Sequence, residues 1–367
     1  MSERVIVGLS GGVDSAVAAL LLKEQGRDVH GLFMSNWEED DDGYCTAAQD
    51  FQDARAVAGE LGIPLHRVSF AAEYRERVFA HFLAEHRAGR TPNPDVLCNR
   101  EIKFGVALRH ARRLGATRFA TGHYARIVAG PAGAQLLKAR DAAKDQSYFL
   151  HAVGITELAE TLMPIGELEK GAVRERARRA GLPVFDKPDS TGICFVGERP
   201  FREFLGRYLT DRPGPIESAD GEPLGTHRGL AFYTLGQREG LGIGGRAGRS
   251  ELPWFVARKD AARNALIVVQ GHDHPLLLSA ALTTGRVHWL SEPRREPAAC
   301  AVKVRYRQAD QPARLEPLPG GGARIVFETP QRAVTPGQYA VLYEGERCLG
   351  GAVIEALEAL PGQRSAA

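Results

Sequence analysis

The hydrophobic and polar positions of the first 125 residues follow two alternating patterns. Short apolar runs predict four buried strands, at 4–10, 28–37, 64–70 and 116–125. Helical spacing between these runs predicts helices at 13–26, 46–62, about 73–88 and 101–115. This alternation indicates an α/β fold with a doubly wound parallel sheet. Ligands of such sheets lie beyond the carboxyl ends of the strands, where the sequence places residues 10–15, Met34 and Gly122.

The remainder of the chain is richer in glycine and in short β-like runs. Residues 155–182 look helical, and after Pro213 many glycines separate short apolar stretches. From about residue 280 the pattern predicts only strands with turns between them, as in a small barrel. We therefore expect an N-terminal catalytic domain, a central β-rich domain, a C-terminal β-barrel and a flexible tail, at residues 1–210, 211–278, 279–360 and 361–367.

Composition narrows the class of protein. The chain is 44% hydrophobic and 25% charged, which is ordinary for a globular protein, and no apolar run approaches the ~20 residues of a membrane helix. A formal net charge of +2 means that a nucleic-acid partner would need a local basic patch. Five widely spaced cysteines without a C-x-x-C pair argue against zinc and iron–sulfur sites. With no signal peptide in MSERVIV, we expect a cytoplasmic protein with free thiols and no membrane partner.

The glycine-rich turn after the first strand, GLSGGVDS at 8–15, has three interpretations. It matches the G-x-S-x-G of serine hydrolases, but that elbow needs an earlier loop for the oxyanion hole, and here the serine follows the first strand. A Walker A loop requires a lysine, and none occurs between Arg4 and Lys23. A plain tight turn remains possible. The remaining interpretation is an anion site, in which backbone N–H groups and serine hydroxyls face a phosphate and Asp14 faces Mg²⁺ or caps the helix.

SGGVDS resembles the pyrophosphate-binding loop of the ATP pyrophosphatases, whose fold is similar to that of adenine nucleotide hydrolases. Further segments resemble the bacterial tRNA-specific 2-thiouridylases over nearly the whole chain: FMSNWEEDDDGYC, TPNPDVLCNREIKF, ATGHYAR, KDQSYFL, DSTGICFVGERPFREFL and YTLGQREGLGIGG. That family places a 2-thio group on the wobble uridine, position 34, of certain tRNAs. The resemblance implies ATP-dependent adenylation of the uracil C2 oxygen, sulfur transfer from a cysteine persulfide, and release of AMP and pyrophosphate.

The resemblance also implies binding residues. It assigns ATP, with Mg²⁺ bound through the nucleotide rather than by the protein alone, to Gly8, Leu9, Ser10, Gly11, Gly12, Val13, Asp14, Ser15, Met34 and Gly122. It assigns contacts with tRNA to Asn93, Pro94, Asp95, His123, Lys144, Asp145, Gln146, Arg305, Tyr306 and Gln338. Because side chains alternate along a strand, Lys303, Arg305 and Arg307 are predicted to share one face of a strand that could bind phosphates or simply be solvated. A further partner is a persulfide donor, either a cysteine desulfurase or a sulfur-relay protein.

Replacing oxygen by sulfur needs two thiols that meet, because freeing sulfur from a persulfide takes a thiol–disulfide exchange. The resemblance implies Cys98 as nucleophile and Cys194 as persulfide carrier. Cys98 is expected just before the helix of 101–115, where the helix dipole and the nearby Arg90, Arg100 and Lys103 would lower its pKa.

Cys194 lies in a glycine-containing loop, and we expect residues 186–198 to be mobile and to be ordered over the site only with tRNA bound. Mild oxidation should then form a disulfide between residues 98 and 194. Asp95 is either a charge at the start of the helix or a general acid or base near the uracil. Cys45, Cys300 and Cys348 are expected to be structural.

Two other functions stay open at this point. A ligase or amidase of the same superfamily, acting on a small metabolite, would need neither paired cysteines nor a basic barrel. A tRNA-binding module with a degenerate nucleotide site would not need the intact SGGVDS, and it would release no pyrophosphate.

Overall fold

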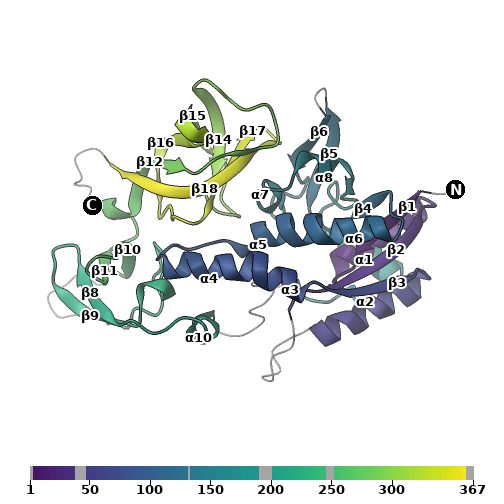
Figure 1. Cartoon of the computed structure of the whole chain (residues 1–367), viewed down its shortest axis with the longest axis horizontal. Coiled ribbons are helices and arrows are strands. Elements are labelled where there is room, and N and C mark those ends of the chain that lie inside the picture. Colours follow the sequence, from purple (N-terminus) through teal and green to yellow (C-terminus); the bar gives the residue numbers. More distant parts are fainter. Residues whose placement is uncertain (1–2, 38–46, 131–132, 190–200, 245–251, 361–367) are drawn as a thin grey trace.

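The computed structural model describes residues 3–37, 47–130, 133–189, 201–244 and 252–360. The predictions for Cys45, Cys194, most of the loop at 186–198 and the tail at 361–367 therefore lie outside the described residues. Within the described part, no helix is both long enough and apolar enough to cross a membrane. Figure 1 shows the parallel sheet near the N-terminus at one end of the molecule and the β-rich parts at the other.

The N-terminal part is built on a five-stranded parallel sheet of order β3-β2-β1-β4-β7, which confirms the predicted doubly wound sheet. Its strands are β1 (Arg4–Gly8), β2 (Asp28–Ser35), β3 (Leu65–Ser69), β4 (Arg118–Ala120) and β7 (Thr161–Leu162). The strand β7 corrects the expectation that 155–182 is wholly helical. Pro164 cannot continue a helix, so the segment divides into α8 (Ile155–Ala159), β7 and α9 (Lys170–Arg179).

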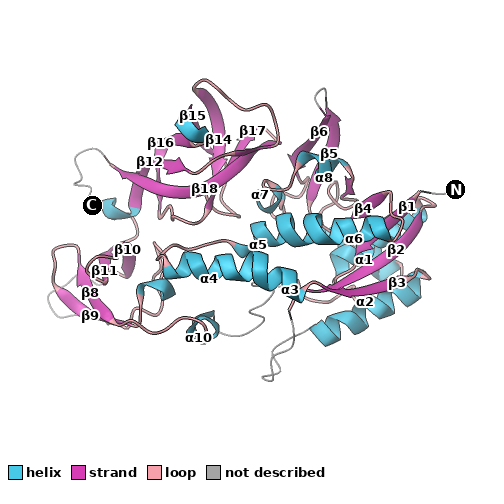
Figure 2. Ribbon diagram, in the orientation of Figure 1, coloured by secondary structure: helices cyan, strands magenta, loops and turns pink. Residues whose placement is uncertain are grey.

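Helices cover both faces of this sheet (Figure 2). Alternate residues of β1 belong to opposite cores. Val5 and Val7 of β1 belong to the core formed with α1 (Val13–Glu24), α2 (Ala47–Leu61) and α9. Ile6 belongs to the opposite core, where the covering segments are α3 (Ala71–Tyr74), η1 (Arg75–Phe79), α4 (Ala80–Arg87), η2 (Cys98–Ala107) and α6 (Leu108–Arg113). The near-continuous apolar character of β1 follows from burial on both sides.

One helical run begins earlier than the sequence pattern predicts. Asn93 caps it, because its side-chain oxygen accepts a hydrogen bond of 3.2 Å from the N–H of Asp95, and Pro94 fills the first helical position. The run continues as α5 (Pro94–Leu97), the π-helical segment η2 and α6. Cys98 consequently lies inside the helical run and not just before it. The cap was hidden in the sequence by the two prolines of TPNP, which read as a loop.

The central part forms a four-stranded sheet of order β10-β11-β8-β9. Its strands are β8 (Gly214–Ser218), β9 (Pro223–His227), β10 (Trp254–Asp260) and β11 (Ala265–Gln270). Two short helices, α10 (Phe201–Gly206) and η3 (Leu230–Phe232), lie on the connections around it. The backbone carbonyl of Ala231 in η3 contacts the ring Nδ1 of His86 at 3.1 Å, which ties this part to α4.

The C-terminal part is a closed antiparallel barrel, as predicted. Its first strand pairs both with the second in the ring and with the last, and this closes the sheet. In ring order the strands are β12 (Leu278–Thr284), β16 (Ala323–Arg332), β15 (Gln311–Pro317), β14 (Ala298–Lys303), β17 (Tyr339–Glu344) and β18 (Arg347–Ala359). The short β13 (His288–Trp289) also pairs with β18.

A hairpin from the N-terminal part joins this barrel, which the sequence pattern did not predict. The predicted strand at 116–125 ends at Ala120, and the chain then forms β5 (Ala125–Gly130) and β6 (Gly133–Lys138). Leu137 of β6 pairs with Arg347 of β18. The short helix α7 (Ser147–Leu150) follows, so the chain crosses to the barrel and returns before β7 is formed.

Candidate active site

The predicted nucleotide residues gather at the carboxyl ends of β1 and β4. The strand order 3-2-1-4-7 reverses its direction of growth between β1 and β4, and ligands of doubly wound sheets bind at such a switch point. Gly8 ends β1 there, and Gly122 follows the end of β4 by two residues. The structure therefore brings the glycine turn and Gly122 together at the position expected for a ligand.

Close backbone approach explains two of these glycines. Gly11 has φ +79°, and a Cβ at this position would lie 2.3 Å from the carbonyl oxygen of Asp50. A Cβ on Gly122 would lie 2.6 Å from both the carbonyl carbon of Asp14 and the nitrogen of Ser15. The turn is thus held between α2 on one side and the segment after β4 on the other, with no room for a side chain.

The serines of the turn have different roles. Ser15 is buried, and its hydroxyl donates to the Gly12 carbonyl at 3.0 Å and accepts from the Ser10 N–H at 3.2 Å. The exposed Ser10 hydroxyl lies 3.1 Å from that of Ser15. Since Gly12 at the N-cap offers α1 no side-chain cap, the N–H groups of the first turn remain suited to an anion.

The other predicted nucleotide residues lie around this turn in different ways. Leu9 and Val13 are buried in the core, so only their backbone atoms could reach a ligand. The Met34 methyl group, at the end of β2, lies 3.5 Å from the position that a Cβ on Gly8 would occupy. All ten predicted residues are therefore neighbours of the switch point.

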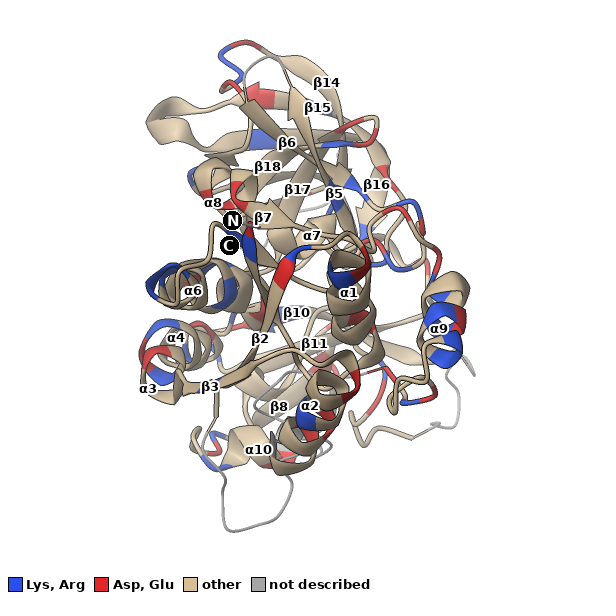
Figure 3. Ribbon diagram, turned by 90° about the vertical axis from the view of Figure 1, so that its right-hand side faces the viewer, with Lys and Arg blue, Asp and Glu red and all other residues tan. Residues whose placement is uncertain are grey.

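A cluster of charged residues around Asp14 escaped the sequence reasoning. The Asp14 carboxylate accepts hydrogen bonds from the Tyr124 hydroxyl at 2.8 Å and from the Lys170 ammonium at 2.7 and 2.8 Å. Lys170 also pairs with Asp189 at 2.7 Å, and Asp189 pairs with Lys144 at 2.6 Å and with Arg174 at 2.9 Å. Figure 3 shows the many basic residues of α9, which packs against α1.

The electrostatics of this cluster follow from its contacts. Burial alone would raise the pKa of Asp189, but hydrogen bonds from Lys144 and Lys170 lower that pKa to about 2. Burial and the neighbouring Asp14 carboxylate raise the pKa of Tyr124 above its ordinary value. At neutral pH Asp189 is therefore ionised and the Tyr124 phenol is neutral.

A second lysine, Lys187, fixes the turn from the outside. Its ammonium donates to the Gly11 carbonyl at 3.1 Å and pairs with Asp50 at 2.7 Å and Asp53 at 2.5 Å. Burial opposes its charge, but the hydrogen bonds from Lys187 to both carboxylates raise its pKa. In the sequence, Lys187 stands only at the start of the loop-like run KPDST, which does not indicate a contact with the turn.

The predicted catalytic residues Asp95 and Cys98 are one helical turn apart on the run that begins at Pro94. Cys98 is buried, with 2% of its surface exposed. Burial raises the pKa of the half-buried Asp95, and the Lys103 charge opposes this. Two of the cations expected to act on Cys98 are paired with carboxylates: Arg90 with Glu85, and Arg100 with Glu101.

His123, predicted beside the target base, is buried next to the same helix. One ring nitrogen lies 2.8 Å from the Thr121 hydroxyl and the other lies 3.4 Å from the Lys103 ammonium. Burial lowers the pKa of His123 well below its ordinary value, and Lys103 acts in the same direction. The imidazole is therefore neutral at physiological pH, beside a lysine that also influences Asp95.

Of the remaining described cysteines, Cys348 is buried and Cys300 is partly exposed. Burial raises the pKa of Cys300 to about 11 and that of Cys348 to about 12, so neither thiol ionises at neutral pH. Cys194 lies outside the described residues, and its predicted approach to Cys98 stays a prediction.

The predicted tRNA contacts at 144–146 form a junction with the barrel. Lys144 pairs with Asp189, and the Gln146 side chain accepts from the Tyr124 N–H at 2.9 Å. Asp145 is buried, where it accepts from the N–H of Ser147 at 3.1 Å and pairs with Lys303 of the barrel at 3.4 Å. These side chains are engaged within the protein, and only Lys144 and Gln146 are partly exposed.

The predicted basic strand face at 303–307 is wrong. β14 ends at Lys303, and residues 304–307 form a bend and turn that the Gln308 side chain holds by accepting from the Val304 N–H at 2.9 Å. Arg305 and Arg307 are exposed on this turn, whereas the Lys303 side chain is only 12% exposed. The ring of Tyr306 packs on that of Phe149, with centroids 4.4 Å apart. The alternation in the sequence therefore did not correspond to a continuous strand.

Gln338 reaches the helical run of Cys98 from the barrel. Its side-chain amide donates to the Thr91 carbonyl at 2.8 Å, and the Thr91 N–H donates to the Pro336 carbonyl at 3.0 Å. Two residues later, Asn93 caps the run. The predicted contact residues Asn93, Pro94 and Gln338 thus meet at one place, where the barrel touches the start of that run.

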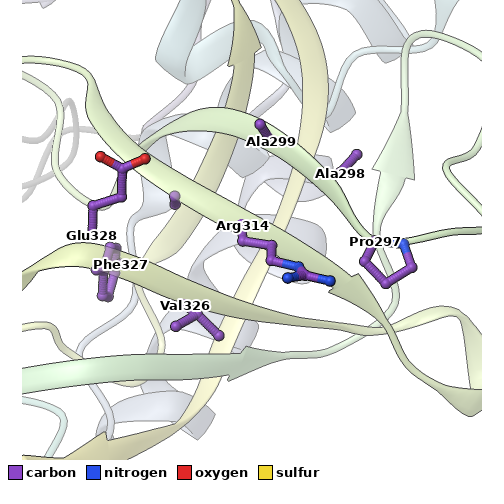
Figure 4. Close-up of a pocket in the computed structure, with 8 residues that line it drawn as sticks. Pro297, Ala298, Ala299, Arg314, Val326, Phe327 and Glu328 are labelled. Carbon is purple, nitrogen blue, oxygen red and sulfur yellow. The ribbon is translucent and has the colours of Figure 1, made fainter.

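A groove of about 450 Å³ opens on the barrel at β14, β15 and β16 (Figure 4). It is lined by one cation, Arg314, one anion, Glu328, and otherwise by apolar residues such as Phe327 and Val326. Without an excess of positive charge, this lining offers no specific attraction for phosphate, and the groove is not the candidate site.

Known protein families and relatives match this chain over nearly its full length. Family models match residues 3–198 (tRNA methyl transferase HUP domain), 202–270 (tRNA methyl transferase PRC-barrel domain) and 279–354 (aminomethyltransferase beta-barrel domain). The "tRNA-specific 2-thiouridylase MnmA" of Burkholderia thailandensis is 58% identical over 362 residues, which cover 96% of this chain and 94% of the relative. That of Methylibium petroleiphilum is 57% identical over 389 residues, covering 96% and 98%.

The names of the domain models mention methyl transfer, whereas the full-length relatives are named for thiolation. The relatives carry the greater weight, because they match all three parts of the chain in one alignment. By this similarity, the chain belongs to the tRNA-specific 2-thiouridylase family.

Proposed function

We propose that this protein replaces the C2 oxygen of the wobble uridine of tRNA by sulfur, at the expense of ATP. The observation that carries the proposal is the 58% identity with 2-thiouridylases over 96% of the chain. The geometry supports it independently, because an uncapped helix N-terminus at the switch point suits the phosphates of ATP. The helical run with Asp95 and Cys98 lies near the same place, because its Lys103 contacts His123, which follows the end of β4.

The reaction divides into activation of the uracil oxygen and transfer of sulfur. First, the uracil C2 oxygen attacks the α-phosphorus of ATP, and pyrophosphate leaves. Second, the Cys98 thiolate attacks the inner sulfur of a persulfide on Cys194, which forms the disulfide between them and releases hydrosulfide. The hydrosulfide attacks C2 and displaces AMP, and a thiol reductant then restores the two cysteines. In this scheme Asp95, whose pKa burial raises, is the candidate acid or base.

Mg²⁺ would be held mainly by the nucleotide. Among the described residues no group of three His, Cys, Asp or Glu side chains could hold a metal ion. Asp14, in the first turn of α1, is the predicted protein contact for Mg²⁺, and its carboxylate would share the ion with the phosphates of ATP. When bound, the ion would stabilise the charge of the leaving pyrophosphate.

The further partners follow from this chemistry. A persulfide donor, such as a cysteine desulfurase or a relay protein, would load Cys194, and the cytoplasm supplies both tRNA and reductant. The tRNA would contact 93–95, 144–146, His123, Arg305, Tyr306 and Gln338. Two of these side chains, Gln338 and Asp145, hold the barrel against the N-terminal part, so the tRNA would exchange contacts there.

Nucleoside analysis tests the proposed function. tRNA from cells lacking this protein should contain no 2-thiouridine at position 34, and the wild-type gene should restore it. A Cys98→Ser gene should not restore it, whereas Cys300→Ser should. Normal 2-thiouridine in the deletion strain would show that the proposal is wrong.

A further inference from the structure

The nucleotide turn carries no cation of its own. Residues 8–15 include Asp14 but neither lysine nor arginine, although a triphosphate brings several negative charges to this place. In the Walker A loop, a lysine within the motif meets this charge. The structure must therefore supply a cation from elsewhere in the chain, and two lysines reach the turn.

Lys187 is bound too tightly by anions to serve. One ammonium group faces two carboxylates, Asp50 and Asp53, and a carbonyl oxygen of the turn. This local group has an excess of negative charge, so moving Lys187 to a phosphate would leave two carboxylates facing each other. Its contacts instead explain how the Gly11 turn is held.

Lys170 lies among as many cations as carboxylates, once the adjacent Asp141 is counted. Its cluster contains three cations (Lys144, Lys170 and Arg174) paired with two carboxylates (Asp14 and Asp189). The nearby Asp141 carboxylate accepts the backbone N–H of Lys170 at 3.0 Å and thereby fixes the start of α9. If Lys170 moved, Asp189 would keep Lys144 and Arg174, and Asp14 would keep the Tyr124 hydroxyl.

The position of Lys170 is also suitable. Its ammonium lies 2.7 Å from Asp14, the second residue of α1, and hence at the helix end that an anion would approach. The side chain is 12% exposed, so its charge is shielded little by water and acts strongly on a neighbouring anion. A lysine stem has enough rotatable bonds to turn from a carboxylate to a phosphate nearby.

We propose that Lys170 is the phosphate-binding cation of this site, which exchanges its contact with Asp14 for one with the pyrophosphate moiety of ATP. The assignment rests on the proposed function, since it assumes that ATP binds at the switch point. Under this assignment, Lys170 takes the part that a lysine within the motif takes in a Walker A loop, although it lies 156 positions after Asp14.

Calorimetric binding of pyrophosphate and of adenosine, each with Mg²⁺, tests this assignment. Lys170→Met should weaken pyrophosphate binding about tenfold or more, the amount expected for loss of a charged hydrogen bond. Adenosine binding should stay within about twofold, and Lys170→Arg should recover part of the pyrophosphate affinity. Arg178→Met is the matched control, because Arg178 lies on the same helix and pairs only locally with Glu175.

The outcomes distinguish failure of the Lys170 assignment from failure of the proposed function. If Lys170→Met binds pyrophosphate as well as the wild type, the assignment is overturned and the proposed function stands. If it loses pyrophosphate and adenosine together, Lys170 is structural and the assignment is again overturned. If the wild type binds neither compound, the nucleotide site itself is wrong, and the assignment falls with it.

Discussion

At the scale of single residues, Gly122 determines how closely the end of β4 approaches the nucleotide turn. Its α-hydrogen faces the backbone of Asp14 and Ser15, and a methyl group would come within 2.6 Å of both. The distance can be restored only if the start of α1 moves. Since the phosphate-binding N–H groups belong to that start, stability and ATP binding should change together.

We therefore expect Gly122→Ala to lower the free energy of unfolding by about 1–3 kcal/mol, as overpacking does, and to weaken ATP binding. Gly59→Ala is the control, because Gly59 lies within α2 with no atom within 4 Å of an added Cβ. It should gain about 0.5–1 kcal/mol from helix propensity. Chemical denaturation and calorimetry measure both effects. Unchanged ATP affinity in Gly122→Ala would contradict this view of the turn.

Asp95 allows a prediction about pH. Because burial raises its pKa in the folded state, ionised Asp95 costs stability at neutral pH, and this cost disappears below the ordinary value of 3.8. Asp95→Asn should therefore melt at a higher temperature than the wild type at pH 7, with the difference vanishing toward pH 3.8. The exposed Asp220→Asn is the control and should change little.

The same variant separates the two roles left open for Asp95. An acid or base near the uracil predicts that Asp95→Asn forms 2-thiouridine much more slowly while tRNA binding persists. A charge that only favours the start of the helix predicts nearly normal thiolation. A lower melting temperature at pH 7 would contradict the burial argument itself.

At the scale of elements, β14 ends between two basic residues for which we expect different roles: Lys303 in stability and Arg307 in tRNA binding. Lys303→Met should cost about 1–3 kcal/mol of stability, because it leaves the buried Asp145 carboxylate without its cation. Arg307→Ala should leave the melting temperature unchanged. It should reduce the salt dependence of tRNA binding by about one unit of slope, the effect of one lost phosphate contact. Binding titrations across a range of KCl and thermal melts check this pair. A reduced slope in Lys303→Met at unchanged stability would reverse the assignment.

Long periodic elements could be predicted from the sequence, whereas short ones and distant pairings could not. Burial on both faces accounts for the apolar runs at 5–7 in β1 and 32–34 in β2, and α1 and α2 are long enough to show helical spacing. The two-residue strand β7 has no period to detect, and it forms only because β4 offers its edge. The hairpin β5–β6 depends on a partner, β18, about 200 positions later.

The candidate site shows the same division. Its glycines and serines are contiguous and could be predicted from the motif. Lys170 and Lys187 are isolated in the sequence, and only the packing of α9 and its following loop places them at the turn. The start of the Cys98 helix was missed because Asn93 could cap a helix or join a loop, and tertiary contacts of Thr91 decide between them.

At the scale of the whole molecule, the barrel is connected to the catalytic part at the start of the helix that carries Cys98. Gln338 and Pro336 bind Thr91, and a Cβ on Gly337 would lie 3.0 Å from the Thr91 nitrogen. Gln338→Ala should therefore accelerate hydrogen exchange of the Thr91 amide and its neighbours, because the contact that shields them is weakened. Gln25→Ala, at the exposed end of α1, should not. Unchanged exchange near Thr91 would mean that Gln338 does not hold this contact in solution.

The central claim is that one protein couples ATP cleavage to sulfur transfer onto tRNA. The most direct test incubates the purified protein with ATP, Mg²⁺, a persulfide donor and tRNA that lacks 2-thiouridine, and measures all products by mass spectrometry. The account predicts AMP, pyrophosphate and 2-thiouridine at position 34 in equal amounts, and no 2-thiouridine with Cys98→Ser. Formation of AMP and pyrophosphate without any thiolated tRNA, or thiolation by Cys98→Ser at the wild-type rate, would contradict it.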